Sequence, residues 1–215
     1  MKLDAMAVTM PLVRDHPNRV PFEGVLTYVD VPSDRAPSGS RGRRVILTRG
    51  AADAALPSLL GMAVDFCPGW DGHDARRKCG IITDAEIVSS RGGSGEIRVA
   101  GYLFGRDFPE VERHLRATPS EKMGMSYELA DAHVEDMRAS VWRLTKVTFT
   151  GAAILLREKA AYGRTSFRLC AGKTNAETKQ ALAARRAEAS RLGRAEEAQQ
   201  KARRRWTNTM RVGQR

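Results

Sequence analysis

Two segments of alternating apolar and polar residues, 78–89 and 96–104, flank a glycine-rich connection and constrain the fold most strongly. Such alternation is typical of β-strands with one buried face. Three of the five connecting residues, 91–95, are glycines, which accept the backbone angles of a tight turn. We therefore expect residues 78–104 to form a β-hairpin.

Several other segments also favour strands, because they are rich in β-branched and aromatic residues. They cover residues 22–31, 43–48, 122–129 and 141–149. One short helix is expected over residues 107–117, with Asp107 as its cap and Pro109 in its first turn. The pattern predicts a mainly β fold with short helices (α+β), in which a small, mostly antiparallel barrel carries the function.

The chain divides by composition into three parts. Residues 1–20 are a proline-containing, irregular leader, residues 21–162 hold the expected strands, and residues 163–215 form a basic tail that is predicted to be helical. The tail carries most of the charge. Residues 172–215 contain twelve Lys and Arg against four Asp and Glu, which leaves +8 of the total +11.

The basic tail has two interpretations. Residues 201–206 combine four basic side chains with Trp206, a composition suited to weak, salt-dependent contact with nucleic acid. Alternatively, the tail is a solvated helix in which Glu197 and Lys201 pair one turn apart. The sequence leaves both open.

The cysteines and the hydropathy pattern indicate the compartment. Cys67, Cys79 and Cys170 are an odd number without the dense spacing of a disulfide scaffold, which favours a reducing environment. No apolar run has the length of a membrane span, and no signal peptide is evident. We expect a cytoplasmic protein without membrane contact.

Cys67, His73 and Cys79 are residue types that bind zinc, and Asp71 lies nearby. Their spacing differs from that of zinc fingers and ribbons, in which paired cysteines are two to four residues apart. We therefore interpret the cysteines as structural or incidental, and expect neither a metal nor a cofactor.

One histidine and one serine stand out as candidate catalytic groups. His73 lies in a polar loop just before a predicted strand, and Ser126 lies inside an apolar strand about fifty residues later. A serine hydroxyl becomes an effective nucleophile when a neighbouring imidazole accepts its proton. This pair predicts a serine hydrolase with His73 as base and Ser126 as nucleophile.

The order of these motifs resembles that of the prohead (capsid maturation) proteases of tailed phages, distant relatives of the herpesvirus assemblins. The resemblance covers roughly residues 20–162. It is carried by His73 ahead of Gly80-Ile81-Ile82, by Gly124-Met125-Ser126, and by the strand that leads into Gly151.

The resemblance implies a herpesvirus-protease-like β-barrel and a serine endopeptidase. Its substrates would be the scaffolding protein, the N-terminal segment of the major capsid protein, and the protease itself. It also implies a homodimer that works inside the assembling prohead, in the cytoplasm of a bacterial host.

The third catalytic residue departs from the family pattern. Lys146 stands where phage members carry a glutamate on the strand after the serine. The third role therefore falls to His133, or to Asp136 in the same turn, and we take His133 as the candidate. The alternatives are a catalytically inactive relative that serves as an assembly component, and a nucleic-acid-binding protein that acts through its basic tail. The resemblance also implies that a helical extension after the protease domain can serve as a scaffold or as a self-cleaved tether.

Overall fold

The computed structural model describes residues 16–89 and 94–170, and its strands agree with a mainly β, α+β protein. The chain divides into two units, residues 1–178 and 179–215, and everything described below belongs to the first. Most of the predicted leader and nearly all of the basic tail therefore lie outside the described residues. Between residues 16 and 170, no described helix has the length and apolar character needed to cross a bilayer.

The described part contains eight strands, two α-helices and three short 3-10 helices. In chain order these are β1 (Val20–Val29), β2 (Arg44–Leu47), α1 (Arg49–Ala55), η1 (Leu56–Leu59), β3 (Ala63–Phe66), β4 (Lys78–Ser89), β5 (Gly95–Leu103), α2 (Pro109–Ala117), η2 (Ser120–Lys122), β6 (Met123–Val134), β7 (Val141–Leu156), η3 (Arg157–Lys159) and β8 (Ser166–Leu169).

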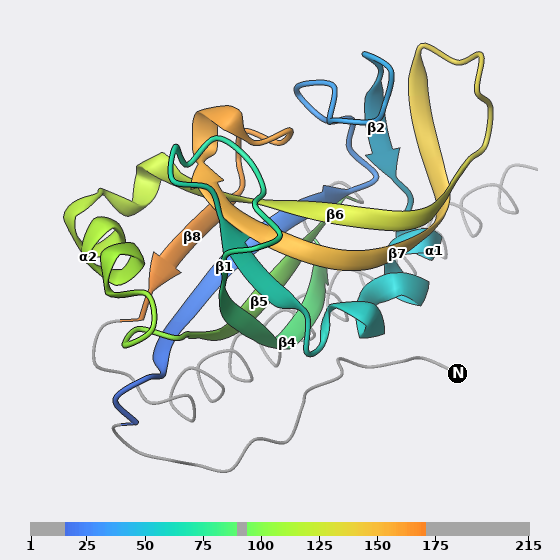
Figure 1. Cartoon of the computed structure of the whole chain (residues 1–215). Helices are drawn as coiled ribbons and strands as arrows, with labels where there is room; N and C mark the ends of the chain where they lie inside the picture. The colour runs from blue at the N-terminus through green and yellow to red at the C-terminus, as the bar shows by residue number, and fades with distance from the viewer. Residues whose placement is uncertain (1–15, 90–93, 171–215) are drawn as a thin grey trace, which may run out of the picture. The chain divides into compact units, whose positions relative to one another are not determined.

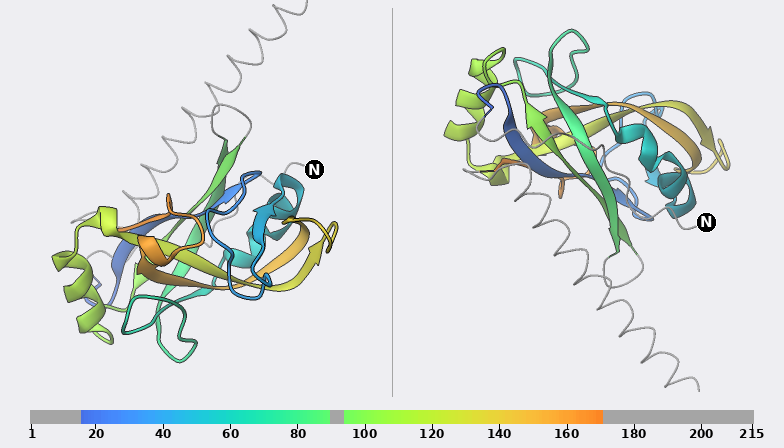
Figure 2. Two further views of the ribbon diagram at one scale, coloured as in Figure 1. Left: turned by 90° about the horizontal axis from the view of Figure 1, so that it is seen from above. Right: turned by 90° about the horizontal axis from the view of Figure 1, so that it is seen from below.

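All eight strands belong to one mixed sheet with the order β2-β7-β3-β4-β5-β1-β8, and β6 pairs with β7 outside this path. Most pairings are antiparallel, but β2 and β3 run parallel to β7. In Figures 1 and 2 the long β6–β7 ribbon crosses over β1 and the β4–β5 hairpin. The described sheet is not closed, so the fold is α+β with a curled sheet, and a barrel is not observed.

The predicted hairpin is confirmed, because β4 and β5 pair antiparallel from Gly80 opposite Leu103 to Ser89 opposite Gly95. The sheet also extends past residue 162, where the tail was expected to begin. β8 pairs antiparallel with β1, with Phe22 opposite Leu169. Phe22 stacks on Phe167 with ring centroids 4.9 Å apart, so burial of aromatic surface holds β8 in place.

The structure differs from the local predictions in two places. The strand expected over residues 141–149 is longer, because β7 runs unbroken to Leu156 and its last residues pair with both β3 and β6. Helix α1 was not expected. The side chain of Thr48 accepts a hydrogen bond from the amide of Ala51 and caps the helix, and three of its alanines are buried.

The core lies between the β6–β7 ribbon and the strands beneath it. Its largest fully buried side chains are Phe22, Phe149, Phe167, Leu26, Leu47, Leu59, Ile82, Ile97, Leu103, Met123, Met125 and Ile154. Met123 and Met125 anchor the start of β6 in this core. Because side chains alternate along a strand, this anchoring places those of Ser126 and Glu128 on the other face.

Candidate active site

Ser126 and Asp65 come from different strands but lie opposite the same residue of β7. Ala153 pairs with Ser126 of β6 on one side and with Asp65 of β3 on the other. Neighbouring strands are about 4.8 Å apart, so the two Cα atoms are about 10 Å apart and their side chains share a face. The small, fully buried Ala153 between them leaves room above the sheet.

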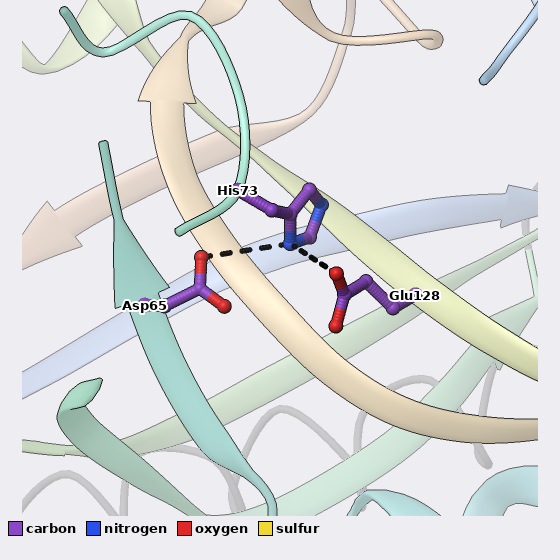
Figure 3. Close-up of side chains that lie close together, drawn as sticks. All are labelled: Asp65, His73 and Glu128. Atoms are coloured by element: carbon purple, nitrogen blue, oxygen red, sulfur yellow. Dashed lines mark ion pairs between the residues drawn. The ribbon is translucent and has the colours of Figure 1, made fainter. Parts of the chain in front are cut away.

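His73 enters this space from the loop between β3 and β4. Trp70 fixes the loop, because its carbonyl accepts a hydrogen bond from the amide of Leu156 at 2.7 Å and its ring stacks on His114 at 4.2 Å. Trp70 has a left-handed backbone conformation (φ 55°), which turns the chain towards the sheet. The His73 side chain is 21% exposed, and it lies over β7 between Asp65 and Glu128 (Figure 3).

Asp65 is the most buried of the polar groups around the imidazole, with no exposed side-chain surface. Its Oδ1 lies 3.5 Å from His73 Nδ1 and accepts a hydrogen bond from the Asp74 amide, and its Oδ2 accepts one from Lys78 Nζ at 2.8 Å. Burial alone would raise the pKa of Asp65, but His73 and Lys78 outweigh it and hold this pKa below its ordinary value. Asp65 is therefore a fixed carboxylate.

Glu128 approaches the same ring nitrogen from β6, with its Oε1 3.7 Å from His73 Nδ1. It lies two residues beyond Ser126, opposite Gly151. A Cβ atom at position 151 would lie 2.9 Å from Glu128 Oε2, so the missing side chain is what makes room for the carboxylate. The side chain of Glu128 is 40% exposed, and this carboxylate is less firmly fixed than that of Asp65.

Both carboxylates face Nδ1, whereas Nε2 points away from them (Figure 3). A neutral imidazole carries its proton on one nitrogen and accepts at the other. Two carboxylates beside Nδ1 favour the proton there, which leaves Nε2 as the acceptor. This is the tautomer that a general base requires.

Ser126 and His73 line one groove with a volume of about 950 Å³. The groove follows β6 from Ser126 to Val134 and is bordered by the loop of residues 35–41. Within the described residues, neither ring nitrogen of His73 has a hydrogen-bond partner, so the Ser126 hydroxyl is not bonded to Nε2. Catalytic hydrogen bonds of this kind are often long without substrate and shorten in its presence.

The structure does not bring His133 to His73. His133 is exposed, is seven residues beyond Ser126 on β6, and lies opposite Lys146. The described group of possible ligands around the imidazole contains Asp65 and Glu128 and not His133. Asp136 lies still further along, in the turn, where it accepts a hydrogen bond from the Arg138 amide. Asp65 and Glu128 occupy the place beside Nδ1.

The three cysteines form no disulfide, and they do not gather around His73. Cys79 is buried on β4, with its thiol directed to the carbonyl of Val64, and burial raises the pKa of this thiol to about 12. The described residues that can jointly hold a metal ion are instead Asp65, His73 and Glu128. The cysteine set considered from the sequence is therefore not assembled.

The thiols should differ in reactivity. We expect iodoacetamide at about pH 8 to label the partly exposed Cys67 and Cys170 of the native protein and to label Cys79 only after denaturation, because the thiolate is the reactive form. Mass spectrometry of tryptic peptides measures this order. Rapid native labelling of Cys79 would contradict the described packing of β4.

Gly151 allows a direct test of the Glu128 position. In Gly151→Ala the new methyl group displaces the flexible carboxylate of Glu128 and meets no backbone atom nearer than that carboxylate. We expect a change in the free energy of unfolding below about 1 kcal/mol and a measurable loss of Ser126 reactivity. Urea unfolding measures the first quantity. A variant with unchanged reactivity would show that Glu128 does not influence His73.

Sequence reasoning identified His73 and Ser126 but missed both carboxylates. Glu128 had a signal, because strand alternation places it on the face of Ser126. Asp65 also had one, as the only charged residue in the short apolar strand Ala63–Phe66. An acid in such a strand is rare without a partner, and here the partners are Lys78 and His73.

Comparisons with protein-family models, with curated proteins and with solved structures found no match.

Proposed function

We propose that the protein is a serine endopeptidase of phage head maturation, with Ser126 as nucleophile, His73 as general base and Asp65 as the residue that positions His73. One observation carries the proposal. Asp65 and Glu128 both lie beside Nδ1 of the imidazole, and His73 and Ser126 line the same groove. This arrangement has the components of a serine nucleophile and its oriented base.

The chemistry follows from the positions of these groups. Ser126 Oγ attacks the carbonyl carbon of the scissile peptide while His73 Nε2 takes the hydroxyl proton. The imidazolium then gives this proton to the leaving amine, and an acyl-enzyme remains. Water attacks the ester with His73 again as base, which releases the acid and restores Ser126. The carboxylates of Asp65 and Glu128 stabilise the positive ring in both stages.

The shape of the groove favours a polypeptide substrate. It extends along about eight residues of β6, and its far part is lined by apolar side chains of Val134, Met137, Trp142 and Leu144. An extended chain fits such a groove better than a compact metabolite does. The proposed substrates are the scaffolding protein, the N-terminal segment of the capsid protein, and the enzyme itself.

The family assignment and the herpesvirus-protease-like barrel belong to the same proposal. They are supported by the order of His73 and Ser126 along the chain and by the curled, mostly antiparallel sheet that presents them. The proposal departs from the expected family pattern at the third residue. Asp65 precedes the histidine on β3, whereas the glutamate expected in that family follows the serine.

A fluorophosphonate probe tests the proposal without knowledge of the substrate. The activated serine oxygen attacks phosphorus and releases fluoride, which leaves a stable phosphonyl-serine. We expect one label, on the peptide that contains Ser126, in the full-length protein and in protein co-expressed with its capsid and scaffolding proteins. Ser140→Ala, at an exposed serine in the turn before β7, is the matched control and should label normally.

Co-expression supplies the biological readout. Mass spectrometry should find defined truncations of the capsid or scaffolding protein when wild-type enzyme is present. Absence of both the Ser126 label and the truncations, in the isolated and the co-expressed protein, would overturn the proposal. The second candidate, an inactive assembly relative, would then be favoured by the missing Ser126–His73 hydrogen bond.

A further inference from the structure

We propose that Asp65, His73 and Glu128 also form a zinc site, and that a bound Zn²⁺ ion switches the hydrolase off. The binding rests only on the geometry of these three side chains. The inhibition rests in addition on the proposed function, because it concerns His73 as the base for Ser126. The two parts are therefore tested by separate measurements.

The geometry matches that of a tetrahedral zinc ion. One ligand atom from each of the three side chains lies within 4.8 Å of the others. His73 Nδ1 is 3.5 Å from Asp65 Oδ1 and 3.7 Å from Glu128 Oε1. Zinc bonds of about 2.0–2.2 Å at tetrahedral angles place ligand atoms about 3.3–3.6 Å apart. The two distances to Nδ1 are within a few tenths of an ångström of these values, and the flexible, partly exposed Glu128 side chain can adjust the separation of the two carboxylates.

The surroundings of these atoms favour a metal in two ways. His73 Nδ1 is shielded from solvent and has no hydrogen-bond partner among the described residues, so the metal does not have to displace a hydrogen bond. The Asp65 carboxylate is already oriented by the Asp74 amide and Lys78, as metal-binding carboxylates usually are. The groove beside Glu128 leaves a fourth position open to water.

The ligand types select the ion. One imidazole nitrogen with two carboxylates suits Zn²⁺, whereas Mg²⁺ and Ca²⁺ prefer oxygen ligands alone. The net charge of the site limits its affinity for the ion. Lys78 Nζ lies 2.8 Å from Asp65 Oδ2 and offsets one of the two carboxylate charges. We therefore expect reversible binding that is weaker than at a closed structural zinc site.

Binding at Nδ1 changes the tautomer of His73. A neutral imidazole with a metal on one nitrogen carries its proton on the other. Zinc on Nδ1 therefore moves the ring proton from Nδ1 to Nε2, without net release of a proton. Nε2 then has no lone pair to accept the hydroxyl proton of Ser126. The ion thus inhibits the enzyme through Nδ1, although the proton acceptor is Nε2.

Calorimetry with zinc chloride tests the site. The full-length chain is used with Cys67→Ser and Cys170→Ser, so that the accessible thiols do not contribute. We expect one saturable ion per chain, binding weakened about tenfold or more in Glu128→Gln, and binding tightened in Lys78→Met. Glu128→Gln is chosen because position 128 is partly exposed and the change should not prevent folding. His133→Gln, on the same strand, is the matched control.

Fluorophosphonate labelling with and without zinc tests the switch. Zinc should slow Ser126 labelling in the wild type, and the same concentration should have a smaller effect in Glu128→Gln. Binding that is absent, or equal in Glu128→Gln and the wild type, would overturn the site. Binding without slower labelling would overturn the switch. Zinc binding in a protein whose Ser126 never labels would uphold the site and overturn the proposed hydrolase.

Discussion

Ser126→Ala is expected to abolish cleavage of the co-expressed capsid and scaffolding proteins and to remove the fluorophosphonate label. Alanine lacks the hydroxyl that forms the acyl-enzyme, and residual catalysis by binding alone is slower by about 10⁴–10⁶-fold. The substitution removes one oxygen from a half-buried strand position opposite Ala153, so the fold should persist. Truncation products measured by mass spectrometry, with thermal unfolding alongside, give the result.

The control is Ser140→Ala, which changes the same residue type in an exposed turn. It should leave both products and label unchanged. If the truncations persist in Ser126→Ala, another nucleophile or a contaminating protease performs the reaction, and Ser126 is not the nucleophile.

Asp65→Asn is expected to reduce the labelling rate of Ser126 by about 10³–10⁴-fold with the nucleophile and the base both in place. An asparagine amide can donate to Nδ1, which places the ring proton on Nε2 and removes the acceptor that Ser126 needs. It also removes the charge that stabilises the imidazolium. Asp74→Asn is the matched control, because Asp74 lies in the His73 loop but pairs with Arg76 and Arg77.

A purely structural role for Asp65 would give a different result. Nitrogen NMR of His73 reports the tautomer directly, and Asp65→Asn should shift the ring proton towards Nε2 in folded protein. The pH dependence of the free energy of unfolding is a second readout. The lowered pKa of Asp65 stabilises the fold above about pH 4, and this contribution is lost as the pH falls through the lowered value. An unchanged tautomer would assign the third role to Glu128.

Local patterns predicted six of the eight described strands, because the signal for each is contained in its own segment, whereas the four-residue strands β3 and β8 were not predicted. The alternation in residues 78–104 and the apolar segments around Ser126 and residue 145 correspond to β4, β5, β6 and β7. Helix α1 was missed because its seven residues contain a glycine and four alanines, too few and too small to show an amphipathic period.

The candidate site was only half predictable for a different reason. His73 and Ser126 belong to recognisable local motifs, but Asp65 reaches them through the parallel pairing of β3 with β7. Nothing in residues 63–66 specifies a partner some ninety residues away in the chain. His133 was chosen because Lys146 occupies the position of the expected glutamate, and the pairing of β6 with β7 places His133 opposite Lys146, seven residues along the strand from Ser126.

Ala153 of β7 pairs with Ser126 on one side and with Asp65 on the other, so β7 aligns both halves of the site. Ser126, Glu128 and Asp65 are positioned by their registers on that one strand, whereas the loop of residues 35–41 forms a separate wall of the groove. If the proposed function holds, substitutions in that loop should alter which polypeptides are accepted without disturbing the residues aligned on β7. Because Ser126 and Asp65 are both in register with Ala153, a one-residue insertion within residues 151–154 would disturb both registers at once. In the proposed enzyme, specificity and chemistry would therefore depend on separate parts of the fold.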